Sequence, residues 1–239
     1  VQKASSQDRS VNDNNEERKA SIQKLLVAQQ NLTDEMKRLY RELDQKETNL
    51  VGGIPIDSEY IIFIIDTSGS MFRYAWPKVI AQIEDTLRVY PKVKGVQIMN
   101  DMGVYMFPSF RSKWIPDSPA RRRAINDRLK TWNAFSNSSP AEGITEAIQT
   151  FNAEDKKISI YVYGDEFTGN SIRRVVDYVD KINQSDTSGE NLVRIHAIGF
   201  PVQFAQPAQL QHTGIRFATL MRELTRKNGG TFVGLNAFR

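Results

Sequence analysis

The hydrophobic and polar positions divide the chain into an N-terminal arm and a larger C-terminal region. Residues 1–14 are polar and lack periodicity, which is typical of a disordered tether. Residues 15–50 contain neither Pro nor Gly, and their apolar residues recur every seven positions. This pattern predicts a long amphipathic helix of about 50 Å whose apolar seam is typical of a coiled coil. The seam consists of Ile22, Leu25, Leu32, Met36, Leu39, Leu43 and Leu50, with the polar Gln29 at one of its positions.

The arm has three possible partners. Its apolar seam can pair with a second copy of the chain, pack on the globular region that follows, or bind a different protein. The heptad spacing favours self-association through residues 22–50. Gly52 and Gly53 suit a helix C-terminus and Pro55 prevents its continuation, so residues 51–58 are expected to be a linker.

Residues 59–239 alternate short apolar runs with segments of helical periodicity, which predicts an α/β domain. The Asn100-Asp-Met-Gly103 segment resembles a hairpin turn, so one strand at the sheet edge is expected to be antiparallel. Strands are predicted at 60–66, 96–100, 104–107, 158–163, 193–198 and 231–235. Apolar stripes predict helices around 76–87, 144–151, 172–182 and 217–224.

Composition excludes several classes of function. The 239 residues contain no Cys, which rules out disulfides, thiolate metal sites and a Cys nucleophile. The net charge of +4 is not gathered into a stripe with interleaved aromatic residues, so we expect no nucleic-acid partner. The longest apolar run, 60–65, is far too short to span a bilayer. Because residue 1 is Val, we expect a processed or trimmed chain, in which membrane contact could come only from a segment outside it.

The strongest chemical signal lies where the first long strand ends. The apolar run Tyr60-Ile-Ile-Phe-Ile-Ile65 predicts a strand buried on both faces, and Asp66-Thr-Ser-Gly-Ser70 follows it. Ligand sites of open α/β sheets lie outside the carboxyl ends of strands. Asp66, Ser68 and Ser70 alternate along this loop, so one carboxylate and two hydroxyls can converge on the hard-oxygen ligands that suit Mg²⁺ or Mn²⁺.

Two further loops are expected at the same edge of the sheet. One lies just before a predicted helix and offers Ser138 or Ser139, of which Ser138 is favoured by its position six residues before Ile144. The other follows the strand 158–163 and offers Asp165. Two acids and three hydroxyls would leave at least one coordination position of an octahedral ion for an outside oxygen.

These segments resemble a von Willebrand factor type A (VWA) domain, a family that includes integrin inserted domains and many bacterial proteins. The resemblance covers about residues 58–235, and Asp66-Thr-Ser-Gly-Ser70 is similar to the first segment of the metal-ion-dependent adhesion site (MIDAS). It implies a Rossmann-like domain with a mainly parallel six-stranded sheet, one antiparallel edge strand and helices on both faces. It also implies direct metal binding by Ser68 and Ser70, water-mediated binding by Asp66 and Asp165, and a partner carboxylate that completes the metal shell.

The chain departs from the family pattern at two places. Serine replaces the usual threonine of the second loop. Only four residues follow Leu235, where the family usually has a long helix, so either this chain is a trimmed piece or this helix is missing. We therefore do not transfer the sliding-helix mechanism of integrin-type members. A testable hypothesis is that the helix predicted from residue 15 occupies the vacant place.

The sequence is compatible with three classes of function. The favoured one is a divalent-metal-dependent protein-binding module, with the N-terminal helix mediating assembly or docking. The alternative is a scaffold that assembles through this helix and has a vestigial metal site, with Asp66 only capping a turn. A hydrolase is disfavoured, because the residue two positions after Asp66 is Ser68 rather than a second acid and no P-loop is present.

Overall fold

The structure, a computed structural model, describes residues 50–237 except 52, 53, 56, 91 and 186. The chain divides into two units, Val1–Asn49 and Leu50–Arg239. The predicted tether, and the predicted helix up to residue 49, lie outside the described residues. Leu50, the last position of the predicted helix, lies in the two-residue strand β1 (Leu50–Val51), which pairs with β2 (Ile54–Pro55) in an antiparallel hairpin. Part of the expected linker is therefore a hairpin.

A six-stranded sheet forms the centre of the second unit and confirms the predicted α/β architecture. The strand order is β5-β4-β3-β6-β7-β8, and every neighbouring pair is parallel except β4 and β5. A parallel sheet of this kind requires crossover helices on its faces. Its strands are β3 (Tyr60–Ile65), β4 (Gly95–Asn100), β5 (Ile115–Pro116), β6 (Ile158–Gly164), β7 (Val193–Gly199) and β8 (Phe232–Gly234).

The antiparallel edge strand exists, but the sequence prediction placed it wrongly. The segment 104–107 forms only an isolated bridge between Tyr105 and Met99, and β5 takes the edge position instead. The Asn100 carboxamide accepts hydrogen bonds from the backbone N–H groups of Met102 and Val104, which holds the chain in a turn. The next element is the 3₁₀ helix η2 (Pro108–Phe110), whose proline cannot donate to a strand ladder.

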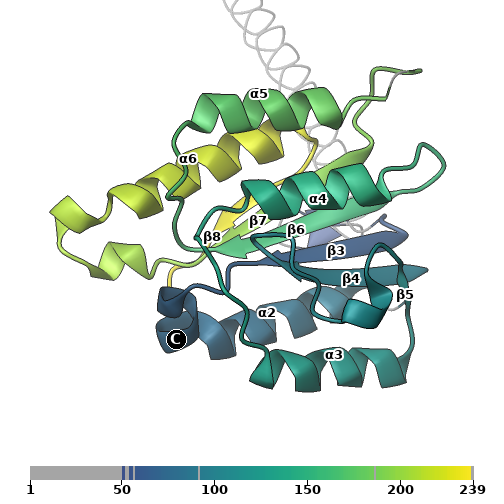
Figure 1. The fold of residues 1–239 in the computed structure, drawn as a ribbon, viewed down its shortest axis with the longest axis horizontal. Helices are drawn as coiled ribbons and strands as arrows, with labels where there is room; N and C mark the ends of the chain where they lie inside the picture. The colour runs from purple at the N-terminus through teal and green to yellow at the C-terminus, as the bar shows by residue number, and fades with distance from the viewer. Residues whose placement is uncertain (1–49, 52–53, 56, 91, 186, 238–239) are drawn as a thin grey trace, which may run out of the picture. The chain divides into compact units, whose positions relative to one another are not determined.

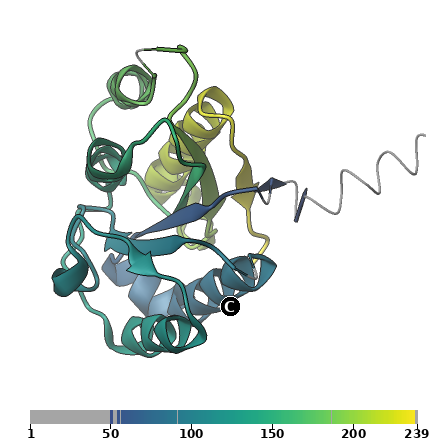
Figure 2. The same ribbon diagram turned by 90° about the vertical axis from the view of Figure 1, so that its right-hand side faces the viewer.

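Helices cover both faces of the sheet (Figures 1 and 2). One face carries α2 (Trp76–Val89) and α3 (Pro119–Thr131), and the other carries α4 (Ala141–Phe151), α5 (Ile172–Ile182) and α6 (His212–Lys227). Four of these correspond to the predicted apolar stripes. The fifth, α3, buries only Ile125 and Leu129, too few positions for a stripe to be recognised. Among the described residues, no helix is both long and apolar enough to span a membrane.

The continuous apolar run of β3 is explained by two separate hydrophobic cores. Ile61, Phe63 and Ile65 pack toward α2 and α3, whereas Ile62 and Ile64 pack toward α4, α5 and α6. Alternate residues of a strand point to opposite faces, so a strand covered on both sides needs no polar positions. Trp76 and Trp132 are buried in the first core, and the partly buried Trp114 lies 4.6 Å, between ring centroids, from both Tyr60 and Phe151.

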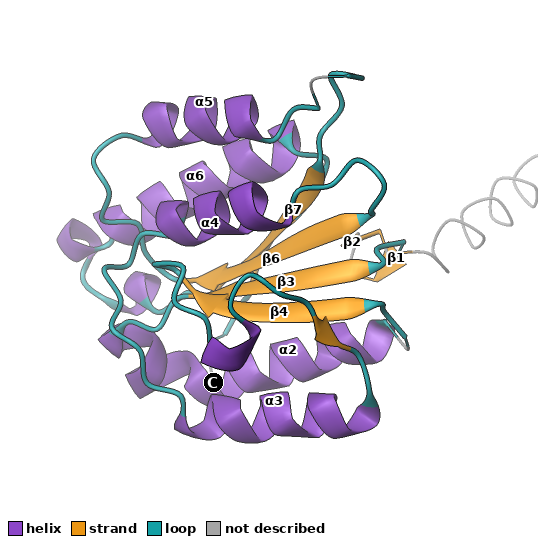
Figure 3. Ribbon diagram, turned by 45° about the vertical axis from the view of Figure 1, so that its right-hand side comes forward, coloured by secondary structure: helices purple, strands orange, loops and turns teal. Residues whose placement is uncertain are grey.

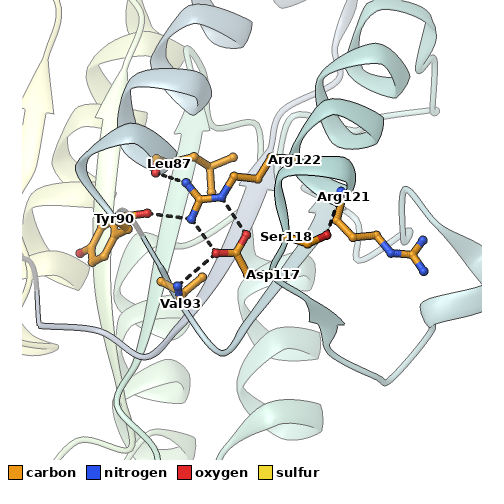
Figure 4. Close-up of polar contacts among 7 residues, drawn as sticks. All are labelled: Leu87, Tyr90, Val93, Asp117, Ser118, Arg121 and Arg122. Carbon is orange, nitrogen blue, oxygen red and sulfur yellow. Dashed lines mark hydrogen bonds and ion pairs between the residues drawn. The ribbon is translucent and has the colours of Figure 1, made fainter.

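A partly buried ion pair joins α3 to the end of α2 (Figure 4). Arg122 donates to both carboxylate oxygens of Asp117 at 2.7 Å, and also to the carbonyl oxygens of Leu87 and Tyr90. The Asp117 side chain is 5% exposed and accepts a further hydrogen bond from the Val93 N–H. Arg122 therefore satisfies carbonyl groups at the C-terminal end of α2 that have no partner within the helix.

His196 on β7 is a core histidine. It is fully buried, its Nδ1 accepts a hydrogen bond from the Thr231 N–H at 3.1 Å, and its ring stacks on Tyr161. Burial and the Arg194 charge lower the pKa of His196 to about 4, so the imidazole is neutral near pH 7.

Candidate functional site

The topology makes the carboxyl ends of β3 and β6 the switch point of the sheet. The chain leaves β3 toward α2 on one face of the sheet and leaves β6 toward α5 on the other face. Loops that diverge in this way open a crevice at the switch point of a parallel sheet, which is where such folds bind ligands. The arrowheads of β3, β4 and β6 lie together at the left of Figure 3. Asp66 follows β3 and Asp165 follows β6 at this edge.

The first loop brings its three predicted ligands together. Asp66 Oδ1 accepts a hydrogen bond from the Ser68 N–H at 2.7 Å, which closes a tight turn, and the Ser68 and Ser70 hydroxyl oxygens lie 3.0 Å apart. The chain then enters the π-helical turn η1 (Met71–Ala75), a geometry often found at functional sites. Asp66 and Ser68 are buried whereas Ser70 is partly exposed, so of the two hydroxyl-bearing residues only Ser70 is accessible from solvent.

The third loop places Asp165 against the first. Asp165 is 1% exposed, its Oδ2 accepts a hydrogen bond from Gln203 Nε2 at 2.9 Å, and its charge acts directly on Asp66. The neighbouring Glu166 accepts a hydrogen bond from the Ser138 hydroxyl at 3.0 Å. This hydrogen bond joins the second loop to the third.

A third acid, Asp101, completes a row of strand-end carboxylates that the sequence analysis missed. It follows β4, is fully buried, and its N–H donates to the carbonyl oxygen of Ile65 on β3. Gly143 allows α4 to approach this turn, because a Cβ there would lie 2.6 Å from the Asn100 carbonyl oxygen and 2.9 Å from that of Asp101. The signal that marked Asp66 and Asp165, a buried strand ending in an acid, is also present at Asp101.

The second loop contributes Ser136, which the sequence analysis also missed. Its hydroxyl oxygen lies 3.1 Å from Asp66 Oδ1 and 2.7 Å from Asp101 Oδ2. One hydroxyl proton cannot serve both contacts fully, so this bridge is best satisfied when one of the two acids carries a proton. Asn100 holds the loop in place by donating to the Phe135 carbonyl oxygen at 2.7 Å. No local sequence pattern marks Ser136.

The two predicted candidates of the second loop differ in their contacts. The Ser138 hydroxyl is engaged by Glu166, and its backbone has a positive φ of 55°. The Ser139 N–H donates to Asp101 Oδ2 at 3.3 Å, while its hydroxyl has no hydrogen-bond partner among the described residues. Both side chains are 6% exposed, so either hydroxyl remains a candidate ligand.

Three buried carboxylate oxygens at this edge lack a partner within the described part of the chain. They are Asp66 Oδ2, Asp101 Oδ1 and Asp165 Oδ1. Burial raises the pKa of Asp66 well above its usual range, and the charges of Asp165 and Asp101 raise it further. Burial likewise raises the pKa of Asp101, and burial together with the charge of Glu166 raises that of Asp165 to about 6. The charges that act on Asp66 and Asp165 are negative, and we call the site formed by these acids with Ser68 and Ser70 the cup.

Asp165→Asn is expected to stabilise the metal-free protein at pH 7.5 and to lose this advantage as the pH falls from about 6 to about 4. The folded-state pKa of Asp165 lies above the usual value, so the folded state binds more protons and its stability falls as pH rises through this window. The shift from 3.8 to about 6 corresponds to a difference on the order of 3 kcal/mol.

Chemical unfolding in EDTA at several pH values measures this difference, and comparison with wild type cancels the titration of His196. Asp155→Asn is the control, because the Asp155 side chain is 81% exposed. A stability difference between Asp165→Asn and wild type that does not change with pH would contradict the expectation.

The oxygen atoms of this site can bind a cation such as Mg²⁺ only if serine hydroxyls act as ligands together with the carboxylates. Within the described ranges, no three His, Asp or Glu side chains are grouped so as to hold a metal by themselves. The partnerless oxygens of Asp66 and Asp165, with the paired hydroxyls of Ser68 and Ser70, fit Mg²⁺ or Mn²⁺. Such a cation would neutralise the charge that raises these pKa values.

Comparisons with known proteins identify the fold but no sequence relative. No family model matches the chain, and no curated protein matches its sequence. The structure is similar to that of a von Willebrand factor type A protein from Catenulispora acidiphila, with a TM-score of 0.54 and 11% identity over 76% of this chain and 39% of that chain. A second similar structure is the conserved hypothetical protein BatB from Bacteroides thetaiotaomicron, with a TM-score of 0.49 and 14% identity over 74% of this chain and 90% of that one.

The first likeness, at 11% identity, concerns the fold alone. The matched region spans 39% of the Catenulispora chain, so most of that protein has no counterpart in the alignment. The described domain has a Rossmann-like von Willebrand factor type A fold, with the six-stranded sheet and the antiparallel edge strand expected from the sequence.

Proposed function

We propose that this protein is a divalent-metal-dependent protein-binding module whose cup accepts an acidic side chain of a partner. The observation that carries the proposal is the group of three buried, partnerless carboxylate oxygens at one edge of the sheet, with two hydroxyls converging beside them. Buried acids without partners destabilise a fold, and a cation that binds them offsets this cost. The fold agrees with this function, since domains of this kind are often protein-interaction modules.

The proposed ligands are the hydroxyls of Ser68 and Ser70, the hydroxyl of Ser138 or Ser139, and Asp66 and Asp165 acting directly or through water. Mg²⁺ or Mn²⁺ would supply a Lewis-acidic position that an outside carboxylate can occupy. Ser70 is the partly exposed member of this set, so the open position lies on its side of the cup. Ser136 holds the first loop through its contact with Asp66, and Asp101 holds the second loop through its contacts with Ser136 and the Ser139 N–H.

The role of the N-terminal arm rests on its sequence alone. Self-association through residues 22–50 would bring several cups together and raise the avidity for a multivalent partner. The scaffold alternative uses the same arm without a metal. The two proposals differ in one measurable property, which is whether the cup binds a divalent cation.

Mg²⁺ is expected to raise the melting temperature of the wild-type protein by about 5–10 °C at a concentration near 100 times its Kd. The double variant Ser68→Ala/Ser70→Ala is expected to lose this increase, because it lacks the paired hydroxyls while retaining Asp66 and its turn. Calorimetric titration with Mg²⁺ and Mn²⁺ measures the same loss as a missing binding isotherm.

The matched control is Ser109→Ala, which removes an exposed hydroxyl from η2. A peptide library displayed on phage, selected once with Mg²⁺ and once with EDTA, tests the second half of the proposal. Asp or Glu should be enriched with Mg²⁺ only. The absence of saturable Mg²⁺ and Mn²⁺ binding by wild type would refute the proposal in favour of the scaffold.

A further inference from the structure

Large exposed apolar side chains gather at the edge of the sheet that carries the cup. Six such side chains occur among the described residues, namely Val104, Phe135, Tyr178, Phe204, Leu210 and Ile215. Four of them, Phe135, Phe204, Leu210 and Ile215, lie in the segments that bear or brace the site, and we call these four the apolar rim. The two segments, 132–140 and 201–215, both reach the carboxyl end of the sheet in Figure 1.

Phe135 presents its ring to solvent from a fixed backbone. Its side chain is 79% exposed, yet its carbonyl oxygen accepts a hydrogen bond from the fully buried Asn100. The next residue, Ser136, contacts Asp66 and Asp101. The ring is thus attached one residue away from the cup, and the fixed backbone lowers the entropy that it would lose when a partner covers it.

Phe204 occupies an equivalent place on the other side. The preceding residue, Gln203, donates to Asp165 Oδ2, and Phe204 itself is 45% exposed. Gln211 Nε2 donates to the Phe204 carbonyl oxygen at 3.2 Å and to that of Gln206 at 2.7 Å, which orders this segment. Phe135 and Phe204 are therefore each bonded to a residue that contacts a cup carboxylate.

Leu210 and Ile215 extend the rim on the Phe204 side. Both are 53% exposed, Leu210 at the end of η4 (Ala208–Leu210) and Ile215 in the first turn of α6. The Phe167 N–H donates to the Thr213 carbonyl oxygen, so this part of the rim is tied to the third loop. Exposed apolar side chains that gather beside a polar site are typical of a protein–protein interaction surface.

We propose that the partner presents its acidic residue within a protein segment that has large apolar side chains close to the acid on both sides. The inference rests on the proposed function, because the acid must bind at the cup for its neighbours to reach the rim. Charge complementarity selects this occupant, since a bound cation attracts one carboxylate while the partly exposed Glu166 repels a run of acids. The apolar rim is removed from water, with a gain in binding free energy, only when the residues that flank the partner's acid are themselves apolar.

The phage-displayed library, selected on wild type with Mg²⁺, tests the inference directly. We expect enrichment of Asp or Glu together with Leu, Ile, Phe or Trp within about three residues of the acid. An extended segment rises about 3.3 Å per residue, so three residues span about 10 Å. The double variant Phe135→Ser/Phe204→Ser is expected to retain enrichment of the acid and to lose that of its apolar neighbours. A peptide selected on wild type should bind this variant about 10- to 100-fold more weakly.

The matched control is Tyr178→Ser, which removes an aromatic ring of similar exposure, 46%, from the middle of α5. It should leave the selection unchanged. Calorimetric titration of the Phe135→Ser/Phe204→Ser variant with Mg²⁺ measures whether its metal site still binds the cation. Flotation with phosphatidylcholine vesicles, with and without phosphatidylglycerol, tests whether the rim binds a membrane instead.

The outcomes separate the two proposals. Mg²⁺-dependent enrichment of acids without apolar neighbours, or equal selection by wild type and the rim variant, overturns this inference and leaves the proposed function standing. A selection that does not depend on Mg²⁺ overturns both proposals. Vesicle binding that requires Phe135 and Phe204, in the absence of peptide enrichment, also overturns the inference.

Discussion

Asp66→Asn is expected to abolish Mg²⁺ binding and, at the same time, to raise the melting temperature of the metal-free protein by several degrees. The two effects have one cause. Asp66 is buried beside Asp165 and Asp101, so its charge destabilises the empty cup and attracts a cation. Asn retains an oxygen that can accept from the Ser68 N–H and places an amide in the position of the partnerless Oδ2.

Thermal unfolding with EDTA and with excess Mg²⁺, together with calorimetric titration, measures both effects on one protein preparation. We expect the wild-type protein to gain stability with Mg²⁺ and the variant to show the same melting temperature in both buffers. Asp127→Asn, at a side chain that is 72% exposed, controls for the loss of one surface charge. An Asp66→Asn variant that is less stable than wild type in EDTA would contradict the expectation that the Asp66 charge destabilises the empty cup. Retained Mg²⁺ binding would remove Asp66 from the ligand set.

Arg122→Met is expected to lower the free energy of unfolding by about 3–5 kcal/mol and the melting temperature by about 10 °C or more. Methionine keeps the aliphatic bulk but leaves the buried Asp117 carboxylate and the Leu87 and Tyr90 carbonyl oxygens without their donor. Burial alone would raise the pKa of Asp117, yet the hydrogen bond and charge of Arg122 keep it below its usual value. Removal of the guanidinium leaves the Asp117 carboxylate, whose side chain is 5% exposed, without its charged partner.

Urea unfolding at pH 7 measures the loss, and Arg123→Met on the exposed neighbouring position is the control. The double variant Asp117→Asn/Arg122→Met should recover part of the stability, because it removes the unpaired carboxylate. If Arg122→Met lowers the free energy of unfolding by less than about 1 kcal/mol, this ion pair contributes no more than an exposed surface pair and the expectation is contradicted.

Features that depend on neighbouring residues were recognisable from the sequence. The run from Tyr60 to Ile65 is apolar at every buried position, so both the strand and its end at Asp66 follow from local pattern. The convergence of Ser68 and Ser70 follows from their spacing within one tight loop, and their hydroxyls lie 3.0 Å apart. Asp165 is marked in the same way, by a buried strand that ends in an acid.

Features that depend on which loops meet were not recognisable. The Ser136 contacts reach Asp66 and Asp101 across 70 and 35 positions of the chain, and no local pattern encodes such a pair. The edge strand was misplaced because the segment 104–107 pairs with β4 only around one isolated bridge before the chain enters η2, and Ile115–Pro116 takes the edge position. The helix α3 escaped notice because an edge position requires only two buried side chains.

The sequence by itself determined the α/β class, the strand that carries the site, and four of the residues at its centre, because each is written in local periodicity and spacing. Only the tertiary structure decided that Asp101 joins Asp66 and Asp165, and that Ser136 bridges two of these acids. It also decided that the exposed Phe135 and Phe204 each adjoin a residue that contacts one of the acids. The physical reason is that the order of strands in the sheet sets which loops are neighbours. Burial and electrostatic repulsion arise only when those loops are brought together.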